Sequence, residues 1–378
     1  MRDELADLAS RLVAIDSVNP DLVPRGAGER EIADFVARWL EDAGLDVERA
    51  EIAPGRWNVV GVAHGSGEGR SLTLNAHMDT VGVEGMEAPF EARIEDGRLF
   101  GRGAYDMKAS LAAIMLTGAR ARELALRGDV VVAAVADEEV ASVGSSAVAS
   151  SRPTDAAIVA EPTEERVAIA HRGFVWLDVE ARGRAAHGSR PDLGIDAIVK
   201  MGRVLVGLDE LDRALQAGPS HPLLGSGSLH ASLIEGGQEL SSYPERCLLR
   251  MERRTVPGET PKRVEAEIRE TIEGAAAADP ELRAEVRTTF AREPFEVEEA
   301  EDLVATLRRH AAAVRGEEPE LVGVPFWTDA AIFAAAGVPT VLYGPTGEGA
   351  HALVEWVDLG SAARCAETYL ALARDFCA

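Results

Sequence analysis

The sequence has little cysteine and no long apolar run. Its 378 residues include only three cysteines, Cys247, Cys365 and Cys377, which form no CxxC or CxxH pattern. This scarcity excludes a disulfide framework and a thiolate zinc site, so we expect three reduced and mostly buried thiols. No apolar run approaches the roughly 20 residues that a membrane-spanning helix requires. We therefore expect a protein that does not enter a membrane.

Basic residues are scarce relative to acidic ones. The chain has 39 Lys and Arg against 64 Asp and Glu, which gives a formal net charge of −25. Because neutralising phosphates needs clustered Lys and Arg, the composition excludes a nucleic acid as the partner. Residues 1–12 repeat hydrophobic residues at helical spacing and lack the uninterrupted apolar core of a signal peptide. We expect a cytoplasmic protein.

Hydrophobic residues are plentiful and occur in short runs. They make up 46% of the chain, and its length is typical of two domains. Apolar runs that suit strands buried on both faces alternate with apolar helical segments; the strand runs are 58–63, 71–79, 129–139 and 156–163. This alternation predicts an α/β domain with a mostly parallel sheet.

The pattern changes after position 171. Alternating strand patterns at 228–237 and 246–258 are interleaved with helical patterns at 194–211 and 261–277. Such an order predicts a smaller α+β domain. We therefore expect a discontinuous catalytic domain, residues 1–171 and 292–378, with an inserted domain at residues 172–291.

Ionisable residues follow several of the expected strands. Taken singly, each has an ordinary explanation, such as a helix N-cap for Asp106 or a solvated surface for the three acids at 137–139. Together they supply oxygen and imidazole ligands that suit Zn²⁺ or a similar divalent ion. Ligand sites of open α/β sheets lie beyond the carboxyl ends of the strands. The candidate residues are His77, Asp79, Asp106, Asp137, Glu138, Glu139, Glu161 and His351.

Five segments in this order make the chain resemble the M20 family of metallopeptidases and amidohydrolases. This family includes acetylornithine deacetylase, succinyl-diaminopimelate desuccinylase and glutamate-releasing carboxypeptidases. The resemblance implies a zinc-peptidase catalytic domain with a mostly parallel sheet and an inserted α+β dimerisation, or lid, domain. The segments are NAHMDT (75–80), GRGAYDMK (101–108), ADEEVASVG (136–144), AEPT (160–163) and GAHALVEWV (349–357).

The resemblance also implies a site for two divalent metal ions. One ion is held by His77 and Glu161 and the other by Glu139 and His351, while Asp106 bridges the two. Zn²⁺ is the expected metal, with Co²⁺ or Mn²⁺ as alternatives. A pair of such ions can activate a water molecule and polarise an amide carbonyl.

Further roles near the metals rest on the same resemblance. Asp79 is expected to orient His77, and Glu138 to act as general base. The residues alone do not decide whether Glu138 or Glu139 is the base. The peptide bond between Asp106 and Met107 is expected to be cis.

The inserted domain carries two further candidates. The resemblance implies that His187 crosses the interface of a homodimer, formed through this domain, and stabilises the substrate carbonyl in the neighbouring active site. Arg254 matches an arginine that binds the substrate carboxylate, although the adjacent Arg253 leaves the choice open. Ser241 stands where relatives often have Asn, so a specific substrate cannot be transferred.

These observations predict a hydrolase that cleaves an amide bond next to a free carboxylate. Its substrate is expected to be an N-acyl amino acid or a short peptide. A di- or aminopeptidase with the same chemistry is the alternative. A catalytically silent metal-binding protein is disfavoured by the presence of Glu138. A nucleotide-dependent enzyme is disfavoured because no GxGxxG follows an early strand.

Overall fold

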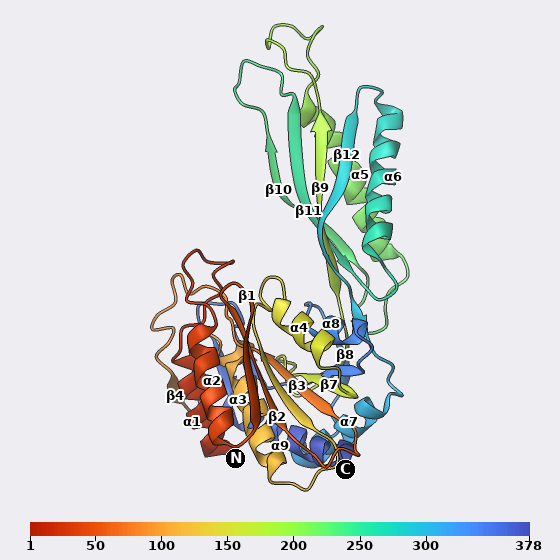
Figure 1. The fold of residues 1–378 in the computed structure, drawn as a ribbon. Coiled ribbons are helices and arrows are strands. Elements are labelled where there is room, and N and C mark those ends of the chain that lie inside the picture. The colour runs from red at the N-terminus through yellow and green to blue at the C-terminus, as the bar shows by residue number, and fades with distance from the viewer. The chain divides into compact units, whose positions relative to one another are not determined.

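A computed structural model describes all 378 residues and divides the chain into two compact units (Figure 1). The expected inserted segment, residues 172–291, lies within the second unit. Unit 1 comprises Met1–Ile169, Val297–Val322 and Thr328–Ala378, and unit 2 comprises Ala170–Glu296 and Gly323–Trp327. The functions of the two parts stay predictions at this point.

Unit 1 is built on a mixed sheet whose central strands are parallel. The strand order is β1-β2-β6-β3-β7-β15-β8, and the four strands from β6 to β15 run parallel. The outer strands β1, β2 and β8 pair antiparallel with their neighbours. The strands are β1 (Asp46–Ala53), β2 (Arg56–Ala63), β3 (Leu72–His77), β6 (Val130–Val135), β7 (Ala156–Val159), β8 (Val167–His171) and β15 (Thr340–Leu342).

Helices cover both faces of this sheet, which explains the continuous apolar runs of its strands. Strands β3, β6 and β7 are buried at every position. One group of helices shares a core with alternate strand residues such as Leu72 and Leu74. This group is α1 (Arg2–Val13), α2 (Arg30–Asp42), α3 (Ala109–Arg122), α7 (Asp302–Arg315) and α9 (Leu359–Phe376); α4 (Val143–Ser151) and α8 (Ala330–Ala335) pack against each other on the opposite face.

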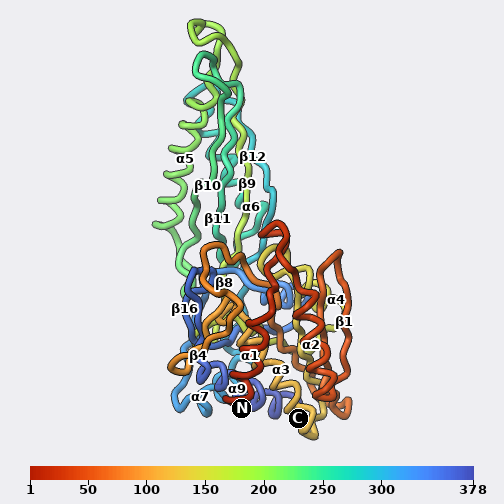
Figure 2. Tube along the Cα trace, turned by 90° about the vertical axis from the view of Figure 1, so that its left-hand side faces the viewer, coloured from red at the N-terminus to blue at the C-terminus, as the bar shows by residue number.

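A small second sheet in unit 1 joins two distant parts of the sequence. Its order is β16-β17-β5-β4, and every pair is antiparallel. Both chain termini lie at the same end of unit 1, where α1 and α9 are in contact (Figure 2). The strands are β4 (Arg93–Glu95), β5 (Arg98–Phe100), β16 (Gly347–Glu348) and β17 (Trp356–Asp358).

Unit 2 is a four-stranded antiparallel sheet with two helices side by side on one face (Figure 1). The strand order is β10-β11-β9-β12. The side chain of Asp196 caps α5, and Thr260 caps α6, which begins with a proline. The elements are β9 (Gly173–Arg182), α5 (Ala197–Ala217), β10 (Ser228–Gly236), β11 (Arg246–Thr255), α6 (Pro261–Ala278) and β12 (Arg283–Arg292). Two further short strands, β13 (Phe295–Glu296) and β14 (Leu321–Val324), pair with β8.

The sequence predicted that the protein does not enter a membrane and that its three cysteines are reduced and mostly buried. None of the helices combines the length and the apolar character needed to cross a membrane. All three cysteines are free and buried.

Candidate metal centre

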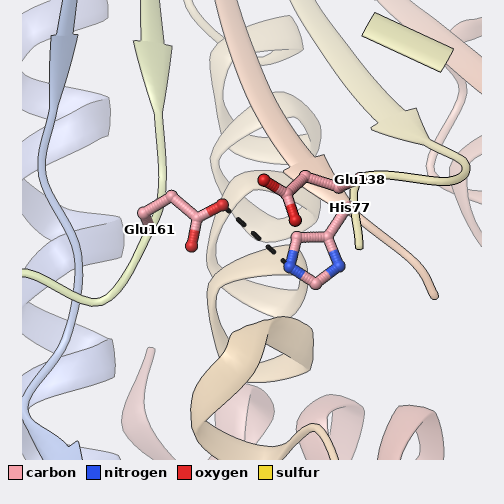
Figure 3. Close-up of side chains that lie close together, drawn as sticks. All are labelled: His77, Glu138 and Glu161. Carbon is pink, nitrogen blue, oxygen red and sulfur yellow. Dashed lines mark ion pairs between the residues drawn. The ribbon is translucent and has the colours of Figure 1, made fainter. Parts of the chain in front are cut away.

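Three adjacent parallel strands deliver acidic and imidazole side chains to one edge of the main sheet. His77 is the last residue of β3, Glu138 and Glu139 follow the end of β6, and Glu161 lies just beyond β7. Because the carboxyl ends of parallel neighbours meet at the same edge, these residues converge. Figure 3 shows the carboxylates of Glu138 and Glu161 directed toward the His77 ring.

The small sheet brings Asp106 and His351 to each other. Asp106 lies in a kinked turn, Ala104–Lys108, that follows β5, and its peptide bond to Met107 is cis. His351 lies between β16 and β17, and β17 pairs with β5. The backbone of His351 is left-handed, with φ of 62°. Non-glycine residues in this conformation cluster at functional sites because surrounding contacts must enforce it.

The carboxylate of Asp106 lies between two imidazoles. Its Oδ1 is 3.1 Å from Nε2 of His77, and its Oδ2 is 3.2 Å from Nε2 of His351. His351 Nε2 is also 3.2 Å from Oε2 of Glu139, and His77 Nε2 is 4.0 Å from Oε1 of Glu161. Each oxygen of one carboxylate thus faces a different histidine.

These side chains form two groups with the spacing of metal ligands. Within each group, the potential ligand atoms all lie within 4.8 Å of one another. One group is His77, Glu138 and Glu161, and the other is His77, Asp106 and Glu139. The two groups contain the predicted ligands His77, Asp106, Glu139 and Glu161 together with Glu138. His351 belongs to neither group and joins the centre through its contacts with Asp106 and Glu139.

Burial and like charge strongly perturb the acids of this centre. Burial, together with the charge of Glu161, raises the pKa of Glu138 well above its usual range. Burial and the charge of Asp106 do the same to the pKa of Glu161. Contacts with Asp106 and Glu139 raise the pKa of His351 to about 10. The site concentrates more negative charge than its two histidines can balance.

The residues present fit divalent metal ions. Oε1 of Glu139 is buried and has no hydrogen-bond partner. A buried carboxylate oxygen without a partner is costly unless a cation or donor compensates it. Carboxylate oxygens and imidazole nitrogens are the ligands that Zn²⁺ and similar ions take. The donor set and its excess charge therefore match a centre for divalent cations.

Asp79 contacts its expected partner through the main chain. Nδ1 of His77 is 2.9 Å from the carbonyl oxygen of Asp79 and 3.7 Å from its carboxylate. The Asp79 carboxylate instead accepts hydrogen bonds from the backbone N–H groups of Glu138, at 3.1 Å, and Glu139, at 3.2 Å. One residue thus orients the histidine with its carbonyl group and holds the two glutamates with its side chain.

Glu355 is a site residue to which the sequence analysis assigned no role. Its buried carboxylate accepts hydrogen bonds from the backbone N–H groups of Gly103, Tyr105 and Asp106, at 2.9–3.0 Å. It also pairs with Arg102 at 2.6 Å. Glu355 therefore fixes the Asp106 turn to the segment that carries His351. The only sequence signal was that Arg102 and Glu355 lie in two of the five motifs.

The other two predicted residues lie in unit 2. His187 is an exposed loop residue whose Nδ1 is 2.8 Å from the hydroxyl of Ser189. Arg254, at the end of β11, pairs with Glu252 at 2.6 Å, and its guanidinium lies 5.3 Å from the centre of the Phe174 ring. The roles of His187 and Arg254 toward a substrate stay predictions.

Comparisons with known proteins agree with the geometry. The model of peptidase family M20/M25/M40 matches residues 73–375. The chain is 30% identical to acetylornithine deacetylase of Myxococcus xanthus, over 97% of this chain and 96% of that protein. It is 28% identical to N-formyl-4-amino-5-aminomethyl-2-methylpyrimidine deformylase of Halalkalibacterium halodurans, over 100% of this chain and 95% of the relative.

Solved structures share the fold over the full chain. Aminopeptidase PepT from Bacillus cereus superposes with a TM-score of 0.80 at 20% identity, covering 100% of this chain and 99% of the other. The YXEP protein of Bacillus subtilis, described as a dinuclear metal binding peptidase from the M20 family, gives a TM-score of 0.76 at 17% identity, with coverages of 100% and 98%. At these identities the likeness establishes the architecture.

Proposed function

Because this chain belongs to peptidase family M20/M25/M40 and is a metal-dependent hydrolase acting on amide bonds, we propose that its substrate is an N-acyl amino acid or a short peptide. The observation that carries the metal-dependent chemistry of this proposal is the Asp106 carboxylate, whose two oxygens face His77 and His351 at 3.1 and 3.2 Å. A carboxylate so placed can bridge two cations. The deacetylase and deformylase relatives favour a deacylase over a peptidase.

Two divalent ions are proposed for this centre, with Zn²⁺ as the expected metal. His77 and Glu161 would hold one ion, Glu139 and His351 the other, and Asp106 both. The dinuclear centre named for the YXEP protein supports this assignment. When bound, such ions polarise the scissile carbonyl and lower the pKa of a water molecule.

Glu138 is proposed as the general base. Its carboxylate lies with His77 and Glu161 at the metal-binding edge, and its backbone is held by Asp79. From this position Glu138 can accept a proton from the attacking water and deliver it to the leaving amine. Asp79 keeps the His77 ring oriented through its carbonyl oxygen.

A substrate panel tests the proposed reaction. We expect the protein to release amine from N-formyl, N-acetyl or N-succinyl amino acids at least about tenfold faster than from dipeptides, because its similar relatives remove acyl groups. Removing metal with a chelator should abolish turnover, and Zn²⁺ or Co²⁺ should restore it. Released amine is quantified for each substrate. Hydrolysis by thoroughly demetallated protein, or no hydrolysis of any panel member, would contradict the proposal.

We also propose a homodimer formed through unit 2. Strand β10 is an edge strand, and it exposes Leu233 and Ile234. Helix α5, which packs beside β10, exposes Ile198, Val199 and Val206, the last at 60%. An exposed apolar edge strand next to an apolar helix face is a surface that a second copy can cover.

A complementation experiment tests both the dimer and His187. We expect His187→Ala to lower kcat about 10²- to 10³-fold, since it removes an oxyanion donor. Mixing His187→Ala with Glu138→Gln subunits should restore about a quarter of wild-type activity, because half of the random dimers contain one intact site. His310→Ala, which removes a histidine paired with Asp375, is the control. A fully active monomer, or no recovery on mixing, would refute shared sites.

A further inference from the structure

A buried hydrogen-bond network connects the N-terminal segment to the proposed catalytic turn. The Asn19 amide nitrogen donates to Oδ2 of Asp79 at 2.8 Å and to Oδ1 of Asp137 at 3.1 Å. The backbone N–H of Asn19 donates to the carbonyl of Thr80 at 2.9 Å. Asn19, Asp79 and Asp137 are all buried. A single amide group therefore holds two carboxylates that would otherwise repel each other.

Arg56 supplies the positive charge of this network. From β2, its guanidinium donates to the Asn19 side-chain oxygen at 2.6 Å and to Glu29 at 2.7 Å, and it lies 3.1 Å from Asp137. It also pairs with Asp21. Its side chain is 5% exposed, and its partners Glu29 and Asp137 are buried, whereas Asp21 is exposed. A planar guanidinium can satisfy several acceptors at fixed angles, which an ammonium group cannot.

The network acts on the turn that carries Glu138 and Glu139. The Asp79 carboxylate, which Asn19 holds, accepts hydrogen bonds from the backbone N–H groups of both glutamates. Asp137 begins the same turn with a left-handed backbone, φ 68°, and its carbonyl oxygen accepts the N–H of Ala141 at 3.1 Å. This conformation persists only where surrounding contacts enforce it. The contacts of Asp137 with Asn19 and Arg56 provide that enforcement.

We propose that Asn19 and Arg56 are positioning residues of the metal centre. By fixing Asp79 and Asp137, they position the backbone from which the Glu138 and Glu139 side chains extend. The inference rests on the proposed function for the roles of these two glutamates. Neither Asn19 nor Arg56 touches the proposed ligands, so each acts through the two aspartates.

The test is Asn19→Ala in the full-length protein. In metal-free protein we expect the amide hydrogens of Glu138 and Glu139 to exchange at least about tenfold faster than in the wild type, while amides within β6 keep their rates. Zn²⁺ affinity, measured by titration, should fall about 10- to 100-fold, as for other residues that orient ligands. With added Zn²⁺, kcat should fall while KM changes less than about threefold.

A second variant keeps the test decisive. Arg56→Lys retains the charge but loses the planar fork of the guanidinium. If Asn19→Ala does not fold, Arg56→Lys should accelerate hydrogen exchange at the amides of Glu138 and Glu139. The matched control is Arg364→Lys, which weakens an ion pair with buried Glu165. It should leave hydrogen exchange at both amides unchanged. Exchange and Zn²⁺ affinity within twofold of wild type in a folded variant would overturn the inference. Exchange needs no substrate, so absence of hydrolysis by the wild type would overturn only the proposed function.

Discussion

Replacing Glu138 with Gln is expected to abolish hydrolysis while metal binding persists. The substitution keeps the size of the side chain and the backbone hydrogen bond to Asp79, and it removes only the proton acceptor. General-base catalysis contributes about 10²- to 10⁴-fold, so kcat should fall by that factor. Initial rates on the best N-acyl substrate and metal content of the same preparation measure both parts.

Glu139→Gln is the matched comparison for Glu138→Gln. Glu139 lies 3.2 Å from His351 and joins the group of His77 and Asp106, so its loss should weaken metal binding. Metal-saturating conditions should then recover part of the activity of Glu139→Gln and none of that of Glu138→Gln. Unchanged turnover of Glu138→Gln would remove this residue from the mechanism.

Asp106→Asn is expected to release both metal ions. Asp106 is the only residue whose two carboxylate oxygens face both histidines, and an amide cannot offer two anionic oxygens. The turn itself should persist, because Glu355 holds its backbone. We expect affinity for both ions to fall at least about 100-fold and activity to reach background. Metal content after dialysis against a fixed Zn²⁺ concentration measures the loss.

The control for Asp106→Asn is Asp358→Asn in the same small sheet. Asp358 caps α9 by accepting the N–H of Ser361 at 2.7 Å. Because Asn caps helices about as well as Asp, Asp358→Asn should keep the stability of the protein and leave both ions bound. If Asp106→Asn instead retained two ions at wild-type affinity, Asp106 would not bridge them.

Much of the architecture could be predicted because burial leaves a pattern in the sequence. The strand run expected at 129–139 contains the apolar residues 130–136, and the structure has β6 at Val130–Val135, buried throughout. A helical pattern was expected at 261–277, and α6 occupies Pro261–Ala278. The small sheet of β4, β5, β16 and β17 was not predicted. Its strands have two or three residues, which is too short to display a period.

The metal-binding edge could be predicted only in part. Acids and histidines directly after buried strands mark the edge, because parallel strands end together. Asp106 and His351 were candidates from the sequence, but their positions in the site depend on the small sheet, so only the resemblance assigned their roles. The resemblance likewise separated Glu138 from Glu139. The structure adds that Glu139 contacts His351, whereas Glu138 groups with His77 and Glu161.

The supporting residues had no local signal. Asn19 contacts a partner 60 positions away and another 118 positions away, and Glu355 binds backbone groups about 250 positions away. An Asn before Pro20 is typical of a turn, and an Arg opening a strand is typical of a surface. Only the tertiary fold makes these side chains buried neighbours of the centre.

Anomalous diffraction from crystals grown with Zn²⁺ tests the dinuclear centre most directly. We expect two peaks about 3.5–4 Å apart, one beside His77 and Glu161 and one beside Glu139 and His351, with Asp106 contacting both. A single peak, or two peaks without the Asp106 carboxylate between them, would contradict the account.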